Sequence, residues 1–228
     1  MCLHNDSYEQ NIEEFTKYVS GLNLPPKCRV ADIGAGTGNF ICQISKVIPY
    51  AEFTHVDSNR EMNQIALKKY DQYKLPNVRV IEDDIQRLDF PDHEFDLIVC
   101  VNALYAMVPQ DLVLRKMRDW LKPNGVFYVI DLGREMKTVD WGVHFLRTAY
   151  KQRRLLAYLN DAFLRGREVL RQNRLTTIAQ NSGRYWMHET ASFGEQLLEA
   201  GFEIERLEPC YRGYADLAIC RSPHASPA

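Results

Sequence analysis

The sequence has no paired-cysteine motif, no bulk positive charge and no apolar run long enough to cross a membrane. Apolar runs such as Leu97 to Val101 fall far short of the roughly 20 residues that a membrane-spanning helix needs. The formal net charge of −2 gives the whole molecule no general attraction for nucleic acid or anionic membranes. Residues 1–6 lack a basic segment followed by an apolar one, so we expect no signal peptide and a cytoplasmic protein without a membrane partner.

The six cysteines are scattered, and no two of them form a Cys-x-x-Cys pair. Several lie in apolar segments, which favours buried free thiols over a disulfide framework or a zinc site. The histidines and carboxylates also lack the spacing of metal-ligand pairs, so we expect no metal site. The cysteines are Cys2, Cys28, Cys42, Cys100, Cys210 and Cys220.

A glycine-rich segment at residues 30–40 is the most informative stretch of the chain. It reads Val-Ala-Asp-Ile-Gly-Ala-Gly-Thr-Gly-Asn-Phe, which predicts a buried strand, a tight turn and the start of a helix. Gly34, Gly36 and Gly38 allow the backbone to approach a ligand closely, because no Cβ stands in the way. No Lys-Ser or Lys-Thr follows, which argues against a triphosphate cradle, and the third glycine comes one residue too early for the dinucleotide pattern. A tight turn without a ligand is the alternative.

Strands and helices alternate from residue 30 onward, which predicts a doubly wound α/β fold with a parallel sheet. Asp57 ends the second predicted strand about twenty residues after the glycines, where this architecture places a carboxylate against ribose hydroxyls. The third predicted strand, 77–85, contains two adjacent aspartates near its end, and the fourth, 95–102, ends at Asn102. Because ligands bind at the carboxyl ends of such strands, we expect Asp57, Asp84 and Asn102 to lie at one site, whereas a solvated strand end is our interpretation of Asp83.

The closing part of the chain predicts a helix followed by a hairpin. Ser192 and Glu195 have the spacing of a capping box, and Gly201 is a typical helix stop. Residues 202–209 and 214–221 then have the pattern of two strands, joined across residues 211–213.

The Asp-x-Gly-Ala-Gly-Thr-Gly-Asn-Phe segment resembles the first motif of class I S-adenosylmethionine-dependent methyltransferases, and the resemblance covers residues 26–133 and 190–221. It implies a mostly parallel, doubly wound, seven-stranded sheet with one antiparallel strand. It also implies S-adenosylmethionine as the cofactor and S-adenosylhomocysteine as its product. In this family Met62 would lie near the adenine, Asp84 would meet the adenine amino group and Ile85 the ring face. The expected cofactor-binding residues are Tyr8 (which could instead pack on the sheet), Asp32, Gly34, Ala35, Gly36, Gly38, Asp57, Ser58, Met62, Asp84, Ile85 and Asn102.

Residues 134–189 depart from the minimal fold, so we divide the chain into a core, 1–133 and 190–228, and a helical insertion, 134–189, between the fifth strand and the last helix. Eleven Lys and Arg face five acidic residues there, which gives the insertion a charge of +6 and leaves −8 for the rest. Contact with something negative is one interpretation, and a solvated helical face is the other. In small-molecule members of the family such an insertion commonly forms a lid over the acceptor. The apolar positions at helical spacing are Leu146, Ala149, Tyr150, Leu155, Leu156, Leu159, Phe163, Val169 and Leu170.

The resemblance implies methyl transfer to a small-molecule acceptor, and the insertion favours an anionic or aromatic metabolite. Three alternatives stay open: an RNA methyltransferase that uses the basic insertion, a non-catalytic cofactor-binding partner protein, and an enzyme whose bound sulfonium donates another group. We disfavour nucleic acid, because the sequence has no RNA-binding module and no Pro-Pro-Tyr type motif after the fourth strand. We expect a monomer or a homodimer. The candidates for a general base, if one is needed, are Tyr105, His144, Tyr150 and His188, although a lone histidine more often serves in packing.

Overall fold

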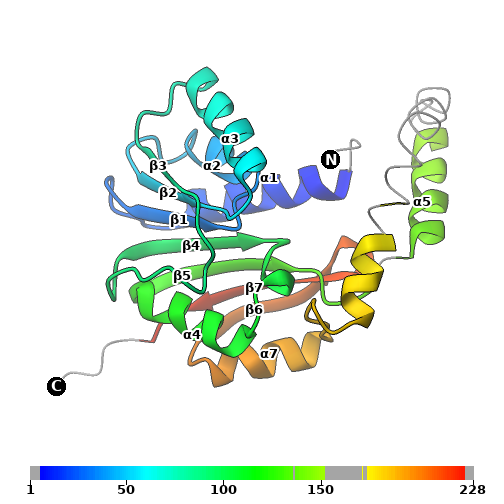
Figure 1. The fold of residues 1–228 in the computed structure, drawn as a ribbon. Coiled ribbons are helices and arrows are strands. Elements are labelled where there is room, and N and C mark those ends of the chain that lie inside the picture. Colours follow the sequence, from blue (N-terminus) through cyan, green and yellow to red (C-terminus); the bar gives the residue numbers. More distant parts are fainter. Residues whose placement is uncertain (1–5, 136, 152–170, 172–173, 224–228) are drawn as a thin grey trace.

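The computed structural model describes residues 6–135, 137–151, 171 and 174–223, and their side chains except at 6–10, 138, 139, 141 and 145 (Figure 1). Seven strands form one sheet in the order β3-β2-β1-β4-β5-β7-β6. The first five strands are parallel, whereas β7 runs antiparallel to both β5 and β6, which confirms the predicted fold class. The strands are β1 (Arg29–Ile33), β2 (Glu52–Val56), β3 (Val78–Ile81), β4 (Phe95–Val101), β5 (Leu121–Asp131), β6 (Glu203–Cys210) and β7 (Ala215–Arg221).

Helices cover both faces of this sheet, and each face has its own apolar core. One core receives side chains from the helices α1, α2 and α3. The other receives side chains from α4 and α7, and it includes Trp120 and Phe193. The helices are α1 (Asp6–Gly21), α2 (Asn39–Ile44), α3 (Arg60–Gln72), α4 (Gln110–Trp120), α5 (Thr138–Lys151) and α7 (Thr190–Glu199), with short 3-10 turns η1 (Leu104–Ala106) and η2 (Tyr211–Gly213).

The sequence of the strand β4 is almost continuously apolar because both of its faces are buried. Leu97 and Val99 belong to one core, while Ile98 and Cys100 belong to the other, because successive side chains of a strand point to opposite faces. Phe95 breaks this alternation, and the pairing of β4 with β5 shifts register between Phe95 and Leu97. A strand that is buried on both sides therefore has no polar face for the sequence to show.

Several predicted boundaries were wrong. The Lys-Pro-Asn-Gly segment at 122–125 predicts a turn before a fifth strand at 126–131, but the strand β5 begins at Leu121 and runs through that segment. The strand β3 ends at Ile81, four residues before the predicted end. The helix α7 begins at Thr190, because the Ser192 hydroxyl accepts the Glu189 N–H rather than capping a helix that starts later.

The helical spacing of Met62, Ile65 and Ala66 predicts that all three face inward on α3, and for two of them this prediction was wrong. Met62 and Ile65 are 39% and 44% exposed, whereas the buried side chains of that helix are Asn63, Ala66 and Tyr70. The helix is therefore turned so that polar side chains face inward at its start, and the reason for this lies in the site described below.

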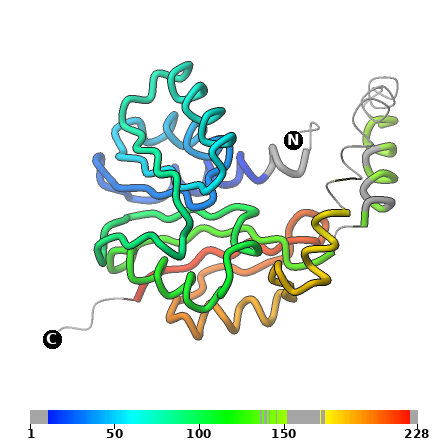
Figure 2. Tube along the Cα trace, in the orientation of Figure 1, coloured from blue at the N-terminus to red at the C-terminus, as the bar shows by residue number. Residues whose placement is uncertain are grey.

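The described part of the insertion is helical at α5 and at residues 174–181. Ala149 is buried, but Leu146 and Tyr150 are exposed, so the predicted apolar face of α5 is not a core face. In Figure 2 the chain leaves β5 and returns to α7 on the same side of the sheet. The predicted positions Leu155, Leu156, Leu159, Phe163, Val169 and Leu170 lie outside the described residues.

Cys28, Cys42, Cys100 and Cys220 are buried free thiols, as predicted, and Cys210 is a free thiol that is partly buried. Cys2 lies outside the described residues. Among the residues that the structure describes, no helix combines the length and the apolar character that crossing a membrane would require.

Candidate cofactor and acceptor site

The loop after β1 crosses to β2 and turns on its glycines. The N–H groups of Gly34 and Ala35 donate to the Val56 carbonyl at 2.8 and 3.0 Å, and the Gly38 N–H donates to the Ala35 carbonyl at 2.9 Å. Gly34, Gly36 and Gly38 have φ angles of 73°, 55° and 72°. Residues with a Cβ are strained in this left-handed region, so the alternation of glycines is a requirement of the backbone.

The three glycines differ in what surrounds them. A Cβ on Gly34 would overlap the Ala103 side chain, and one on Gly38 would overlap the Tyr70 ring. A Cβ on Gly36 would find no described heavy atom within 4 Å. Gly34 and Gly38 therefore serve the packing of the loop, whereas Gly36 borders open space that a ligand can enter.

Asp57 follows β2 and holds the rim of this loop. Its Oδ2 atom accepts the Gly36 N–H at 2.8 Å, and its Oδ1 atom accepts the Asn59 N–H at 2.7 Å. The Asn59 side chain in turn caps α3. A carboxylate oxygen has more than one lone pair, so this half-buried carboxylate can accept ligand hydroxyl groups while it holds the loop.

Buried polar side chains behind the loop connect β2 to α3. The His55 Nδ1 atom lies 2.7 Å from the Tyr70 hydroxyl, and its Nε2 atom lies 2.9 Å from the Asn63 Oδ1 atom. The Asn63 amide also donates to the Asp57 carbonyl at 3.0 Å. Burial lowers the pKa of His55, which therefore acts as a neutral imidazole with one donor and one acceptor. These contacts explain the inward polar face of α3.

Lys69 adds a second connection between α3 and the loop. Its ammonium group donates to the Thr37 carbonyl at 3.0 Å, to the Thr37 hydroxyl at 2.9 Å and to the Asn39 Oδ1 atom at 2.6 Å. The sequence alone did not point to four of these residues, His55, Asn63, Lys69 and Tyr70. The spacing of seven residues between Asn63 and Tyr70 puts both on one helix face, which was the available signal.

Asp32 lies beneath the loop and is almost completely buried. Burial, together with the nearby charge of Asp57, raises the pKa of Asp32 to about 8. Its Oδ2 atom has no hydrogen-bond partner among the described residues. A buried carboxyl group without a partner is costly, so the site is suited to a ligand that brings a positive charge or a donor.

The residues expected around the adenine lie at the same edge of the sheet, after β2, β3 and β4. Ser58 and Asp84 are exposed, Met62 is partly exposed, and Ile85 is 5% exposed within the core. Asn102 has a φ angle of 54°, and its buried Oδ1 atom has no hydrogen-bond partner among the described residues. The side chain of Tyr8 lies outside the described ones. The structure thus brings the predicted cofactor residues after β1 to β4 to one edge, although their roles stay predictions.

The four candidates for a general base come from three parts of the chain: the η1 turn, the helix α5 and the segment before α7. Tyr105 is half-buried in η1, and its ring packs against the Tyr185 ring with 4.8 Å between centroids. Burial first, and then the neighbouring Tyr185 and Asp131, raise the pKa of Tyr105 to about 12. Of the two candidates on α5, His144 is partly buried, whereas Tyr150 is 75% exposed. His188 is buried, and its Nε2 atom lies 3.3 Å from the Asp131 Oδ2 atom.

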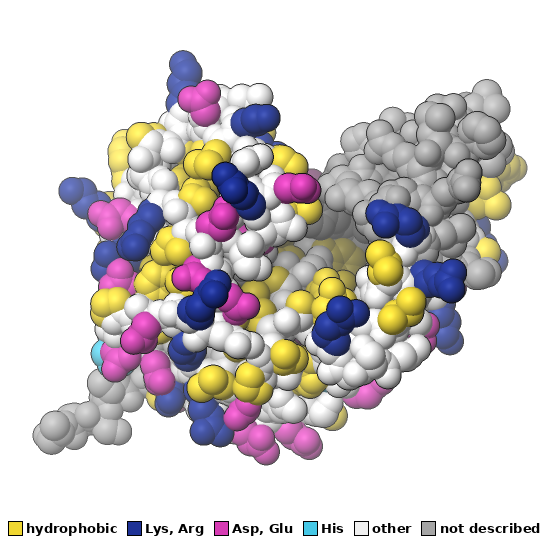
Figure 3. Space-filling view, viewed as in Figure 1, with side chains coloured by type: hydrophobic (Ala, Val, Ile, Leu, Met, Phe, Trp, Pro, Cys, Tyr) yellow, Lys and Arg dark blue, Asp and Glu magenta, His cyan; other side chains and the backbone are white. Residues whose placement is uncertain are grey.

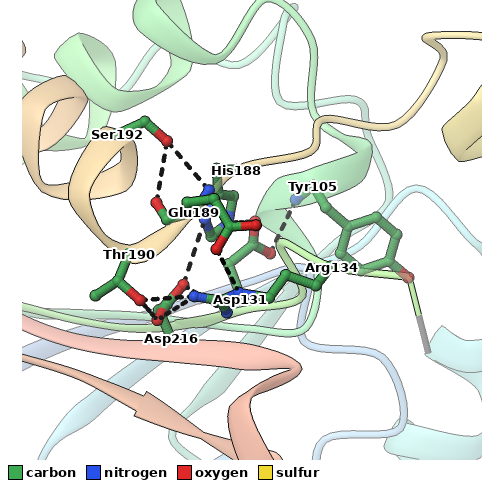
Figure 4. A network of polar contacts seen from close by, with 8 residues as sticks. All are labelled: Tyr105, Asp131, Arg134, His188, Glu189, Thr190, Ser192 and Asp216. Atoms are coloured by element: carbon green, nitrogen blue, oxygen red, sulfur yellow. Dashed lines mark hydrogen bonds and ion pairs between the residues drawn. The ribbon is translucent and has the colours of Figure 1, made fainter. Parts of the chain in front are cut away.

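A polar network surrounds His188 where β5 and β7 meet the insertion (Figure 4). The Asp131 Oδ1 atom accepts the Tyr105 N–H at 2.9 Å, and the Tyr105 ring points away from that carboxylate. Figure 3 shows the surface hollowed between the α3 side of the molecule and the part at residues 174–181. This hollow adjoins the carboxyl edge of the sheet, where an acceptor could approach a bound cofactor.

The sheet order, the glycine turn and the carboxylate after β2 together define a Rossmann-like methyltransferase fold. A family model described as "Methyltransferase domain" matches residues 30–125. This match covers less than half of the chain, and it includes both the glycine turn and Asp57.

Curated methyltransferases are similar to part of the chain. The "Ubiquinone/menaquinone biosynthesis C-methyltransferase UbiE" of Pseudomonas paraeruginosa is 32% identical over 124 residues, which are 54% of this chain and 48% of that protein. The protein of the same name from Teredinibacter turnerae is 30% identical over 129 residues, 56% of this chain and 51% of that protein. The matches thus span about half the length of these relatives.

Solved structures share the fold at low sequence identity. A "SAM dependent methyltransferase" from Aquifex aeolicus has a TM-score of 0.61 and 17% identity, covering 92% of this chain and 88% of that one. The "[4+2]-Cyclase SpnF" has a TM-score of 0.66 and 16% identity, covering 96% of this chain and 83% of that one. At this identity the likeness concerns the fold alone.

Proposed function

We propose that the protein transfers the methyl group of S-adenosylmethionine to a small-molecule acceptor, an anionic or aromatic metabolite held under the insertion 134–189. The observation that carries the proposal is the Gly36 turn: an open position of positive φ whose N–H is held by Asp57, within a domain of the methyltransferase family. The UbiE name of the relatives supports an aromatic acceptor.

The residues present fit this cofactor, whose sulfonium supplies an already activated methyl group. Asp57 would accept hydrogen bonds from the ribose hydroxyls. Because Gly36 has no Cβ, the loop backbone would leave room for the cofactor beside it. The Asp32 Oδ2 atom and the Asn102 Oδ1 atom, which have no hydrogen-bond partner within the described part of the chain, would face its cationic or donor groups. Met62, Asp84 and Ile85 would border the adenine, and Ser58 would be a further cofactor contact.

The protein's contribution to the chemistry is then mainly positioning. In-line attack on an activated methyl group needs the acceptor to be oriented and water to be excluded. Tyr105 is our first candidate on the acceptor side, because it follows the carboxyl end of β4. With a pKa near 12, its hydroxyl would orient an acceptor as a proton donor rather than remove a proton as a phenolate. His144 and Tyr150 on α5 stay candidates.

The test is transfer of labelled methyl groups from S-adenosylmethionine to metabolite fractions, with fractions of aromatic acids and quinols assayed separately. We expect label in a small-molecule fraction, and we expect Tyr105→Phe to reduce its appearance about tenfold or more with unchanged cofactor affinity. Label that disappears after nuclease treatment would point to RNA instead. Cofactor binding without label in any fraction would contradict methyl transfer and favour a partner protein or another group donor. We also propose a cytoplasmic monomer or homodimer, which size-exclusion chromatography with light scattering tests for oligomeric state.

A further inference from the structure

Two buried carboxylates face each other at the ends of β5 and β7. Asp131 and Asp216 are register partners across the antiparallel pair, and both have 0% exposure. Like charges directly opposite each other destabilise a sheet, and burial makes each unpaired charge more costly. This pair therefore needs positive charge between or beside its members.

His188 occupies the position between them (Figure 4). Its Nε2 atom is hydrogen-bonded to the Asp131 Oδ2 atom at 3.3 Å. Its Nδ1 atom lies 3.5 Å from the Asp216 Oδ2 atom, which is within ion-pair distance, although the two atoms are not aligned for a hydrogen bond. A neutral imidazole has one N–H, so one of its nitrogens would present a lone pair to a carboxylate. Only the imidazolium has an N–H toward each carboxylate. The geometry thus favours a charged His188.

Arg134 supplies the second cation of the cluster. Its guanidinium lies 3.0 Å from the Asp216 Oδ2 atom and 3.1 Å from Glu189, and it donates to the Thr190 hydroxyl at 2.6 Å. Thr190 in turn donates to the Asp216 Oδ1 atom at 2.6 Å. The positive charge of Arg134 thus compensates the negative charges of Asp216 and Glu189. Among the described residues, His188 is then the cation that compensates the charge of Asp131.

The cluster joins the two ends of the insertion. Arg134 is its first residue, and His188 and Glu189 are its last. The backbone N–H of His188 donates to the Gly133 carbonyl at 3.0 Å, and a Cβ on Gly133 would overlap the His188 ring. The two stems of the insertion are therefore packed against each other at the edge of the sheet.

The same cluster reaches the acceptor side. The Asp131 carboxylate accepts the backbone N–H of Tyr105 at 2.9 Å. The backbone N–H of Trp186 donates to the Tyr105 carbonyl at 2.8 Å. The Trp186 ring lies 4.4 Å from the His188 ring, and the Phe193 ring stacks on His188 at 4.5 Å. His188 is thus connected to the η1 turn, which carries Tyr105, through Asp131 and Trp186.

We propose that His188 is a positioning residue: a buried imidazolium between Asp131 and Asp216 that fastens both stems of the insertion and the Tyr105 turn to the sheet. This inference rests on the proposed function insofar as the insertion and Tyr105 form the acceptor site. It assigns His188 a role other than that of a general base, because its ring is enclosed and already protonated.

The electrostatics support this assignment. Burial opposes the charged form of His188, but its contacts with Asp131 and Asp216 outweigh burial and raise its pKa. Burial likewise opposes the charge of Asp216, yet His188, Arg134 and Thr190 outweigh it and lower the pKa of that carboxyl group. Burial raises the pKa of Asp131 despite His188. The stability that the charged His188 contributes is fully present below the ordinary pKa of histidine, about 6.5. It is lost as the pH rises through the raised pKa of His188 in the folded protein.

The direct test is an NMR titration of the imidazole groups in the full chain labelled at histidine, with His188→Gln to identify the resonance. We expect both ring nitrogens of His188 to be protonated at pH 7, so the midpoint of the titration should lie above 7 and not at the ordinary value of about 6.5. We expect Asp131→Asn to move that midpoint about one to three pH units lower. A neutral His188 at pH 7, or a midpoint that Asp131→Asn leaves in place, would overturn the proposal.

Hydrogen exchange tests the fastening itself. In His188→Gln we expect at least tenfold loss of protection at the amides of Arg134 and Trp186, with unchanged protection at Gly34 and with unchanged cofactor affinity. His93→Gln, at an exposed histidine, is the matched control and should change neither. Equal protection in both variants would contradict the proposal, and if His188→Gln does not fold, the titration of the natural protein decides. A protein that binds no S-adenosylmethionine would refute the proposed function while leaving the His188 measurements interpretable.

Discussion

Asp57 offers the sharpest prediction, because one side chain links the glycine loop to the start of α3. Replacing it with alanine removes the acceptors of two backbone N–H groups, those of Gly36 and Asn59. Hydrogen bonds to a charged group contribute about 1.5–3 kcal/mol each, but water can replace much of this at a half-buried position. We therefore expect Asp57→Ala to lower the free energy of unfolding by about 1–2 kcal/mol.

The loss of cofactor affinity should be the larger effect. Asp57→Ala would lose its contacts with the ribose and also the order of the Gly36 turn, so we expect at least a tenfold weaker Kd, which corresponds to about 1.4 kcal/mol. Asp57→Asn keeps the size of the side chain and should lie between alanine and the natural residue. Denaturant unfolding gives the stability, and calorimetric titration with S-adenosylmethionine gives the affinity. A Kd of Asp57→Ala within twofold of the natural protein would refute the assignment of Asp57.

Three further predictions concern the same loop. Gly36→Ala should weaken cofactor binding more than it lowers stability, and Gly34→Ala should do the reverse because its Cβ meets Ala103, as titration and thermal unfolding would show. Tyr70→Phe should cost about 1–3 kcal/mol of stability in denaturant unfolding, because it leaves a buried nitrogen of His55 without its partner. Because its pKa is about 8, Asp32 is protonated in the free protein at neutral pH, so binding of a cation should release its proton. Affinity should then rise between pH 6 and 7, and calorimetry in buffers of different ionisation enthalpy should detect the proton.

Each of these has a result that would contradict it. Parallel losses of stability and affinity in the two glycine variants would mean that Gly36 does not border the ligand. A Tyr70→Phe protein as stable as the natural one would show that water satisfies His55. Binding heats that do not depend on the buffer would show that Asp32 stays protonated, or that it does not face the cationic part of the cofactor.

The fold was predictable because its signals are local. The apolar run of β4, the glycines after β1 and the alternation of strands with helices each depend on neighbours in sequence, and all agree with the same architecture. Boundaries failed where a tertiary contact decided them. The Ser192 hydroxyl, for example, accepts a hydrogen bond from the Glu189 N–H, so α7 starts closer to the amino terminus than predicted.

The site was only half predictable for a similar reason. Gly36 and Asp57 stand at characteristic spacings, so the sequence alone pointed to them. The contacts of His55 with Tyr70, and of His188 with Asp131 and Asp216, join residues from separate elements. A histidine that satisfies buried partners cannot be told from a catalytic one until the strands are placed side by side, and no periodicity in the sequence shows that Asp131 faces Asp216.

The central claim is that the edge of the sheet at the glycine loop binds S-adenosylmethionine. Calorimetric titration of the folded protein, first freed of any copurified ligand, tests this most directly. We expect one site that binds S-adenosylmethionine and S-adenosylhomocysteine with micromolar affinity, and we expect Asp57→Ala to weaken the binding of both. Absence of binding by either compound would contradict it, and the fold would then stand without the function proposed for it.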